Sequence, residues 1–365
     1  MKEFEDLKGL LRNNDSFDMG ILAGAFENLS QMNKNYKLSF IVFSSIQSPI
    51  KLFHNWHNAD YSFNLDDFNG FHIVNLSRTI KKAREIKGSF GVSRFGKTNI
   101  WMAFTSESSD FFENGVVRFI ESYRPDISRI YLSSEELREL FERVEDNLSC
   151  EIYVKKAVLY SHVKEGIMSF ENKQFQELFN EAETESRYVD KVEYDIQEDN
   201  VSTYHGFVSR NLISYYYSGR INRFLDYILP TIAKIVERKI NIFKDKERNY
   251  ENAEATPLCI NFSQDVIGCK YDNIRLIKAL EKVSGGAVAV YHKNPYLHMS
   301  FLDFIDGSNF DIFITDSNKI TIIPNYKCSM YSLMRVTDQI FKGFDEGDVK
   351  LAERYTYSFA DFMAE

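Results

Sequence analysis

Three short clusters of turn-forming residues in the C-terminal part of the chain constrain its fold more than any other feature. Each cluster separates two strand-sized runs of apolar or alternating residues, and the clusters are Asn294-Pro295, Asp306-Gly307-Ser308-Asn309 and Asp316-Ser317-Asn318. Strands joined by such short turns pair as antiparallel hairpins, because a parallel connection needs a crossover of a dozen or more residues. The sequence therefore predicts a meander of four strands between residues 287 and 323.

Two helix patterns and one more strand pattern flank this meander. Leu258 to Phe262 reads as a strand, Asp272-Asn273 can cap a helix, and Gly285-Gly286 terminates that helix. A closing helix carries apolar residues at helical spacing between Leu333 and Phe344. The order is β-α-β-β-β-β-α within residues 256–344, which predicts a small antiparallel-sheet domain with both helices on one face.

The predicted order of these elements resembles a half-repeat of the TATA-binding-protein fold. That fold grips the minor groove of DNA with basic and apolar side chains on its open sheet face. Residues 256–344 contain nine Lys/Arg and eight Asp/Glu. This near-neutral charge favours packing of the open sheet face on a partner domain over a grip on DNA.

The residues before this domain alternate between strand and helix patterns, which predicts an α+β protein with a mixed α/β N-terminal region. The clearest helix start is the capping box Ser133-Ser-Glu-Glu136. Residues 244–254 are charged and lack apolar anchors, which indicates a domain boundary. We predict an N-terminal α/β region, a middle α/β region that ends in amphipathic helices, the small C-terminal domain and an acidic tail, at residues 1–130, 131–248, 256–344 and 345–365.

The tripeptide Val92-Ser93-Arg94 recurs as Val208-Ser209-Arg210, each time shortly after a glycine and before a strand-like run. Such a recurrence is either a trace of an internal duplication or a coincidence. Three matched residues without a longer alignment favour coincidence.

The sequence predicts a cytoplasmic protein that does not cross a membrane. Met1 to Asn14 lacks the continuous apolar core of a signal peptide, and no window approaches the roughly 20 apolar residues of a spanning helix. The four cysteines show no metal-binding spacing, and we expect buried thiols at Cys150, Cys259, Cys269 and Cys328.

A basic stretch between residues 78 and 97 interrupts a chain whose formal net charge is −9. Residues 78–87 read as a basic helix. The stretch holds one acid, Glu85, and seven cations, which are Arg78, Lys81, Lys82, Arg84, Lys87, Arg94 and Lys97. Phe90, Phe95 and Trp101 lie among them, so phosphate contacts and base stacking are both available. We predict a nucleic-acid or anion-binding surface here, and the alternative is a solvated helix face that pairs with an acidic surface.

Residues 91–98, Gly-Val-Ser-Arg-Phe-Gly-Lys-Thr, match the phosphate-loop pattern letter for letter. A working phosphate loop follows a buried strand and opens a helix whose first amides hold the phosphates. Here a helix pattern precedes the match and a strand pattern, Asn99 to Phe104, follows it. The context therefore favours a hairpin turn through Phe95-Gly96-Lys97.

Histidines and aspartates gather around a stretch without a clean period, Pro49 to Gly70, where we expect a surface loop. The group could bind a divalent metal and activate water, and it consists of His54, His57, His72, Asp60, Asp66 and Asp67. No recognised metal-hydrolase spacing is present among these residues, so we predict neither a metal nor a cofactor.

These observations favour a non-catalytic binding or scaffolding subunit of an intracellular assembly. We expect it to contact DNA or RNA through the basic stretch and to bind a protein partner or a second copy of itself. Two alternatives stay open. One is a nucleotide-binding or metal-dependent hydrolase that uses residues 91–98 or the histidine and aspartate group. The other is a subunit that binds only proteins.

Overall fold

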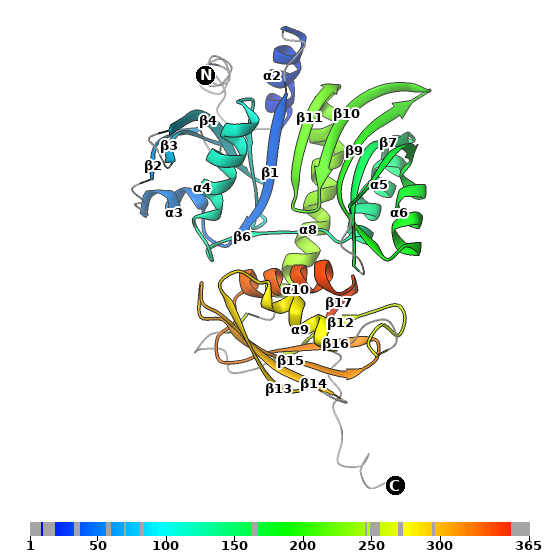
Figure 1. Ribbon diagram of the computed structural model, residues 1–365. Coiled ribbons are helices and arrows are strands. Elements are labelled where there is room, and N and C mark those ends of the chain that lie inside the picture. Colours follow the sequence, from blue (N-terminus) through cyan, green and yellow to red (C-terminus); the bar gives the residue numbers. More distant parts are fainter. Residues whose placement is uncertain are drawn as a thin grey trace. The chain divides into compact units, whose positions relative to one another are not determined.

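The fold is known from a computed structural model (Figure 1), which describes residues 9, 19–32, 37–55, 60–68, 71–80, 84–162, 167–244, 247–248, 256–268, 273–293 and 296–351. Two antiparallel sheets and the helices beside them make up about 44% strand and 34% helix, so the protein is α+β as the sequence predicts. The chain divides into two compact units, Met1–Asn241 and Ile242–Glu365. The finer boundaries at residues 130, 248 and 344 stay predictions.

An eleven-stranded sheet organises the first unit. Its order is β2-β3-β4-β5-β1-β11-β10-β9-β7-β8, and β6 also pairs with β1. The strands are β1 (Leu38–Ser45), β2 (Tyr61–Phe68), β3 (Phe71–Ile80), β4 (Arg84–Arg94), β5 (Ile100–Thr105), β6 (Ile127–Arg129), β7 (Glu151–Ser161), β8 (Ile167–Gln174), β9 (Arg187–Glu198), β10 (Val201–Ser209) and β11 (Ile213–Gly219). The sheet therefore runs through both the N-terminal and the middle region that the sequence separates.

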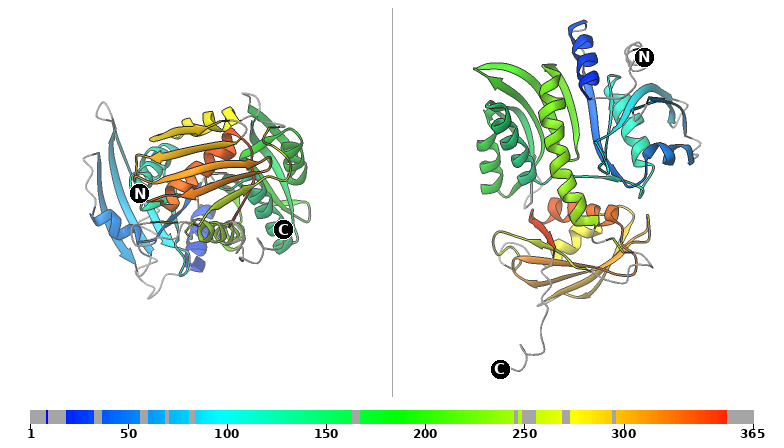
Figure 2. Two further views of the ribbon diagram at one scale, coloured as in Figure 1. Left: turned by 90° about the horizontal axis from the view of Figure 1, so that it is seen from below. Right: turned by 180° about the vertical axis from the view of Figure 1, so that it is seen from behind.

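Helices cover both faces of this sheet. They are α2 (Met19–Met32), α3 (Pro49–Asn55), the π-helical turn η1 (Phe111–Val117) with α4 (Arg118–Glu121), α5 (Ser134–Leu148), α6 (Phe175–Thr184), α7 (Ile221–Arg223), the π-helical turn η2 (Phe224–Ile228) and α8 (Leu229–Lys244). On one face, Phe119 of α4 packs against Phe90 of β4. On the other face, Phe40 of β1 packs against Phe224 of η2, and α8 passes behind β1 and β11 (Figures 1 and 2).

The capping box at residue 133 is confirmed. Ser133 Oγ accepts a hydrogen bond from Glu136 N at 3.2 Å, and Glu136 Oε2 accepts one from Ser133 N at 2.8 Å. The helix α5 that follows buries Leu137, Leu140 and Phe141. The sequence pattern predicts this amphipathic helix because its buried positions recur every three to four residues.

Two predictions for the segment 49–94 are wrong. Residues 78–87 do not form a basic helix, because β3 and β4 pair there as a hairpin with Arg78 opposite Ile86. Residues 49–70 are not an irregular loop, since α3 and β2 lie within them. In β2 the apolar residues Tyr61, Phe63 and Leu65 alternate with polar ones and rest against the core. That alternation is a strand signal, which the many Asn and Asp residues obscure.

The second unit confirms the predicted β-α-β-β-β-β-α order and adds a strand at its end. Its elements are β12 (Leu258–Asn261), α9 (Asn273–Glu281), β13 (Gly286–His292), β14 (Leu297–Asp303), β15 (Asn309–Asp316), β16 (Lys319–Pro324), α10 (Met330–Gly343) and β17 (Asp348–Leu351). The sheet order is β13-β14-β15-β16-β12-β17. Both helices lie on one face of this sheet, as expected (Figures 1 and 2).

Three of the four cysteines are free thiols in the described residues. Cys259 and Cys328 are buried, which confirms the expectation for these two, whereas Cys150 is half-buried. Burial raises the pKa of the Cys150 thiol to about 11. Cys269 lies outside the described residues. No helix in the described part of the chain is long and apolar enough to cross a membrane.

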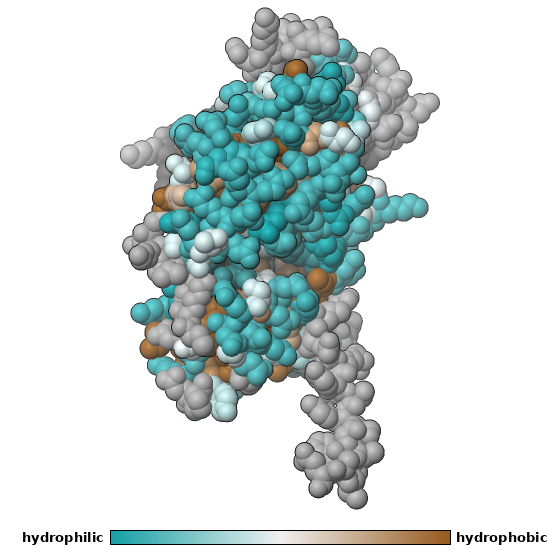
Figure 3. Space-filling view, turned by 90° about the vertical axis from the view of Figure 1, so that its right-hand side faces the viewer, coloured by the Kyte–Doolittle hydropathy of each residue, from teal (hydrophilic) through white to brown (hydrophobic). Residues whose placement is uncertain are grey.

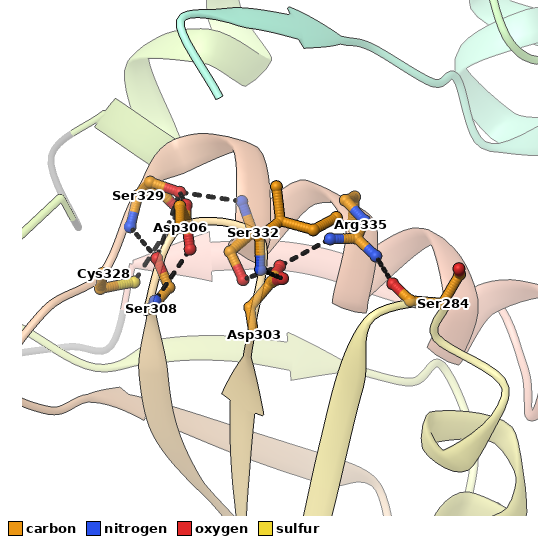
Figure 4. A network of polar contacts seen from close by, with 9 residues as sticks. Ser284, Asp303, Asp306, Ser308, Cys328, Ser329, Ser332 and Arg335 are labelled. Carbon is orange, nitrogen blue, oxygen red and sulfur yellow. Dashed lines mark hydrogen bonds and ion pairs between the residues drawn. The ribbon is translucent and has the colours of Figure 1, made fainter. Parts of the chain in front are cut away.

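A buried polar network joins the turn between β14 and β15 to the start of α10 (Figure 4). The fully buried Asp303 carboxylate accepts hydrogen bonds from Ser332 Oγ at 2.9 Å and from the Arg335 guanidinium at 2.7 Å. Next to it, Ser308 Oγ accepts a hydrogen bond from Ser329 N at 2.9 Å. Asp306 accepts a further bond from Ser329 Oγ. These contacts attach the β14–β15 turn of the sheet to α10.

Asp303→Asn should weaken this attachment, because the change leaves Arg335 without its buried counter-charge. We expect a loss of about 2–3 kcal/mol, below the usual cost of breaking a buried ion pair since Arg335 is partly exposed. Hydrogen exchange of amides in β14 and α10 measures the change. Asp348→Asn removes an exposed partner of Lys350 and should leave the amide protection almost unchanged. Equal protection in the two variants would contradict the assigned role of Asp303.

Candidate nucleic-acid interface

The cations of the basic stretch do not form one compact surface. Arg78 lies on β3, Arg84 and Arg94 lie at opposite ends of β4, and Lys97 lies in the turn between β4 and β5. At about 3.3 Å per residue, the ten steps from Arg84 to Arg94 span about 33 Å. Lys81 and Lys82 lie outside the described residues. The sequence island is therefore two groups at the two ends of one hairpin strand.

The group at the β3 end contacts nearby carboxylates and carbonyls. Arg84 pairs with Asp110 at 2.5 Å, and Lys87 pairs with Glu85 at 2.9 Å. Arg78 donates a hydrogen bond to the Asn114 carbonyl, and its guanidinium lies 5.2 Å from the ring centroid of Tyr61. Asp110 directly precedes η1, and Asn114 belongs to it. Arg78 and Arg84 therefore hold η1 against the hairpin.

The group at the β5 end stabilises the hairpin turn. Arg94 donates hydrogen bonds to the carbonyls of Thr98 and Lys97, and its guanidinium lies 5.7 Å from the Trp101 ring. Gly96 has a positive φ of 52°, which glycine adopts readily. Residues 91–94 belong to β4 and residue 100 begins β5, so residues 91–98 are the end of a strand and the hairpin turn that follows it, and they open no helix.

The histidine and aspartate group is only partly within the described residues, since His57 lies outside them. His72 Nδ1 lies 3.2 Å from Asp67 Oδ1, and burial lowers the pKa of His72 although Asp67 opposes the shift. His54 lies on α3 and Asp66 on β2. Within the described ranges, no three His, Cys, Asp or Glu side chains come together as a set that could hold a metal.

The second unit carries an aromatic feature that the sequence reasoning missed. Tyr291, His298 and Phe313 lie on three neighbouring strands, β13, β14 and β15. The rings of His298 and Phe313 stack with centroids 4.3 Å apart and an angle of 14° between their planes. The Tyr291 ring lies 4.8 Å from that of His298. We call these three residues the ring stack.

The ring stack lies on the sheet face that the helices leave open. Met299 of β14 and Ile312 of β15 are fully buried, and their side chains alternate with those of His298 and Phe313. Tyr291 is 64% exposed. The signal that could have located the stack is this alternation of buried aliphatic with ring-bearing residues in two predicted strands.

The surroundings of the ring stack contain both lysines and aspartates. Lys293 follows β13, and Lys319 begins β16 at the same end of the sheet. The nearest carboxylate is Asp311, which accepts a hydrogen bond from Ser300 and lies 3.9 Å from His298 Nε2. The surface therefore combines one exposed ring and two half-buried rings with lysines at its border, where Asp316 lies opposite Lys319.

A second row of aromatic side chains, on β10 and β11 of the first unit, is less suited to phosphates. Phe207 packs against Tyr215 at 5.1 Å, and Tyr215 stacks with Tyr217. Burial and the nearby Glu113 carboxylate raise the pKa of Tyr215 to about 12. Burial and Glu193 raise the pKa of Tyr217 as well. Two carboxylates act on this row, against the single Asp311 beside the ring stack, so a nucleic-acid backbone would be repelled more strongly here.

The surface over α5 and α6 is also unfavourable for nucleic acid. Residues 135–199 contain 18 Asp/Glu and eight Lys/Arg. Figure 3 shows an almost continuous hydrophilic surface on this side of the first unit. Of the surfaces compared, the ring stack offers the best combination of stacking and charge.

The anion-binding role of the basic stretch stays a prediction that salt dependence can test. If Lys97 contacts a phosphate, Lys97→Ala should lower the slope of log Kd against log salt concentration by about one. Lys234→Ala removes an exposed cation from α8 and serves as the matched control. An unchanged slope for Lys97→Ala would exclude this residue from the interface.

No protein-family model matches this chain, and no curated protein matches it closely enough to count as a relative.

Proposed function

We propose that this protein is a non-catalytic binding subunit of a cytoplasmic assembly, and that its second unit holds single-stranded DNA or RNA on the open face of its sheet. The single observation that carries the proposal is the ring stack, in which the His298 ring centroid lies 4.3 Å from that of Phe313 and 4.8 Å from that of Tyr291. A protein partner completes the assembly that we envisage.

The ring stack suits unpaired bases better than a duplex. Every base has an aromatic face, and stacking of one base on an aromatic side chain is worth about 1–3 kcal/mol. Because His298 lies between the other two rings, the outer faces of Tyr291 and Phe313 are the ends at which bases can extend the stack. In a duplex these base faces are already occupied, so single strands are the preferred ligands.

The net negative charge of the chain limits where the phosphate backbone of the nucleic acid can lie. The chain has a net charge of −9, and long-range attraction of a polyanion is therefore weak. Lys293 and Lys319 lie at the end of the sheet beside the stack and supply local phosphate contacts. We expect modest affinity that falls as the salt concentration rises.

Phe313→Ala should weaken binding of a fluorescent single-stranded oligonucleotide by about tenfold or more, because it removes one outer face of the stack. Fluorescence anisotropy at low salt measures the dissociation constant for DNA and RNA oligonucleotides of mixed sequence. Tyr326→Ala is the matched control, since Tyr326 is 61% exposed and follows β16 at the opposite end of that strand. Unaltered binding by Phe313→Ala, or no binding by the wild-type protein, would refute the proposal.

A further inference from the structure

Among the described residues, the two sheets end at four edge strands, and three of these carry charges that discourage pairing with another strand. The edge strands are β2 and β8 in the first unit and β13 and β17 in the second. Charged residues lie on three of them, namely Asp66 and Asp67 on β2, Glu171 and Lys173 on β8, and Asp348 and Lys350 on β17. Charges on an edge strand are a common protection against edge-to-edge association.

The fourth edge, β13, lacks this protection. Its sequence is Gly286-Ala-Val-Ala-Val-Tyr-His292, with no Asp, Glu, Lys, Arg or Pro. Ala287 and Ala289 are exposed, and Val288 and Val290 are half-buried. Within the described residues, β14 is the one strand that pairs with β13. A row of backbone donors and acceptors therefore faces outward along a neutral, apolar strand.

An irregularity at the end of β13 limits the length over which it can pair. The register with β14 shifts between Val290 and His292, so that Tyr291 is the extra residue. The Tyr291 ring packs on His298 of its own unit. The regular part of the strand is Gly286–Val290, and its midpoint is Val288.

We propose that this edge binds the same edge of a second copy, as an antiparallel pair centred on Val288. The two-fold axis then places Val288 opposite itself and Ala287 opposite Ala289 of the second copy. A two-fold pair brings the same surface of each copy together, so the surface must be complementary to itself. This strand satisfies that condition, because small and β-branched side chains face one another and no like charges meet.

Self-pairing fits β13 better than the other edges. Two copies of β2 would bring Asp66 and Asp67 of each copy close together, and cross-strand carboxylates destabilise a pair. The helix beside β13 also contributes apolar surface, since Ile274 of α9 is 50% exposed. A five-residue strand pair is a small interface, and we expect a dissociation constant on the order of 10 μM.

Sedimentation equilibrium of the full chain, without nucleic acid, tests the proposal. The wild-type protein should convert from monomer to dimer across the micromolar range. Ala287→Glu with Ala289→Glu should shift this transition to at least tenfold higher concentration, because carboxylates then face one another across the two-fold axis. A wild-type protein that stays monomeric up to about 200 μM, well above the expected constant, would overturn the proposal.

Ala287→Lys with Ala289→Glu is the matched control, since it adds two charges to the same positions. In the proposed register each introduced lysine faces an introduced glutamate of the second copy, and dimerisation should be retained. Hydrogen exchange of β13 and β14 in both variants verifies that the sheet is folded. If both double variants dimerise equally well, the proposed register is wrong. It is also wrong if both lose dimerisation to the same extent. The outcome is independent of nucleic-acid binding, which the anisotropy measurement tests separately.

Discussion

The first unit depends on β1 pairing along both of its edges. One edge of β1 pairs with β5, and the other pairs with β11 over its first half and with β6 over its second half. All eight residues of the strand are buried. Since successive side chains point to opposite faces, Phe43 joins the layer beneath α3 and α4 while Phe40 joins the layer beneath η2. A single strand thus supports both hydrophobic layers and holds the two halves of the sheet together.

The two halves that β1 joins are similar in topology. Each contains a meander, β3-β4-β5 on one side and β9-β10-β11 on the other, and the last strand of each meander pairs with β1. The recurring Val-Ser-Arg tripeptide lies at the end of the middle strand of each meander. Arg94 is the last residue of β4, and Arg210 directly follows β10. Arg94 is exposed at a turn, whereas Arg210 is fully buried between the rings of Tyr131 and Tyr188. The tripeptide therefore lies at equivalent positions in the two meanders, but its two arginines have different surroundings.

The features that could be predicted from the sequence are those that depend on residues close together in the chain. The capping box at Ser133 and the turns at residues 306–309 and 316–318 depend on neighbours within a few residues, and these features were predicted correctly. The predicted turn at Asn294-Pro295 lies outside the described residues. The helix predicted over residues 78–87 was wrong, because a local pattern does not show that this segment pairs as a hairpin. The hairpin keeps Arg78, Arg84 and Lys87 close together, since Arg78 lies opposite Ile86. Arg94 lies at the other end of β4, about 33 Å from Arg84, so the cations engage either η1 or the turn.

The alternation in β14 and β15 can place His298 and Phe313 on one face, but the ring stack also depends on the register, which sets the residues of three strands that lie side by side. That register follows from turn length and from the shift at Tyr291, which no local pattern reveals. The same shift connects the two proposals. Pairing of β13 about Val288 would extend one open face over both copies, with the two His298 rings about 25 Å apart from strand spacing and rise. A single strand of nucleic acid that reached both stacks would bind the second one at high effective concentration. Two linked stacking sites on an acidic protein would then bind more tightly than one.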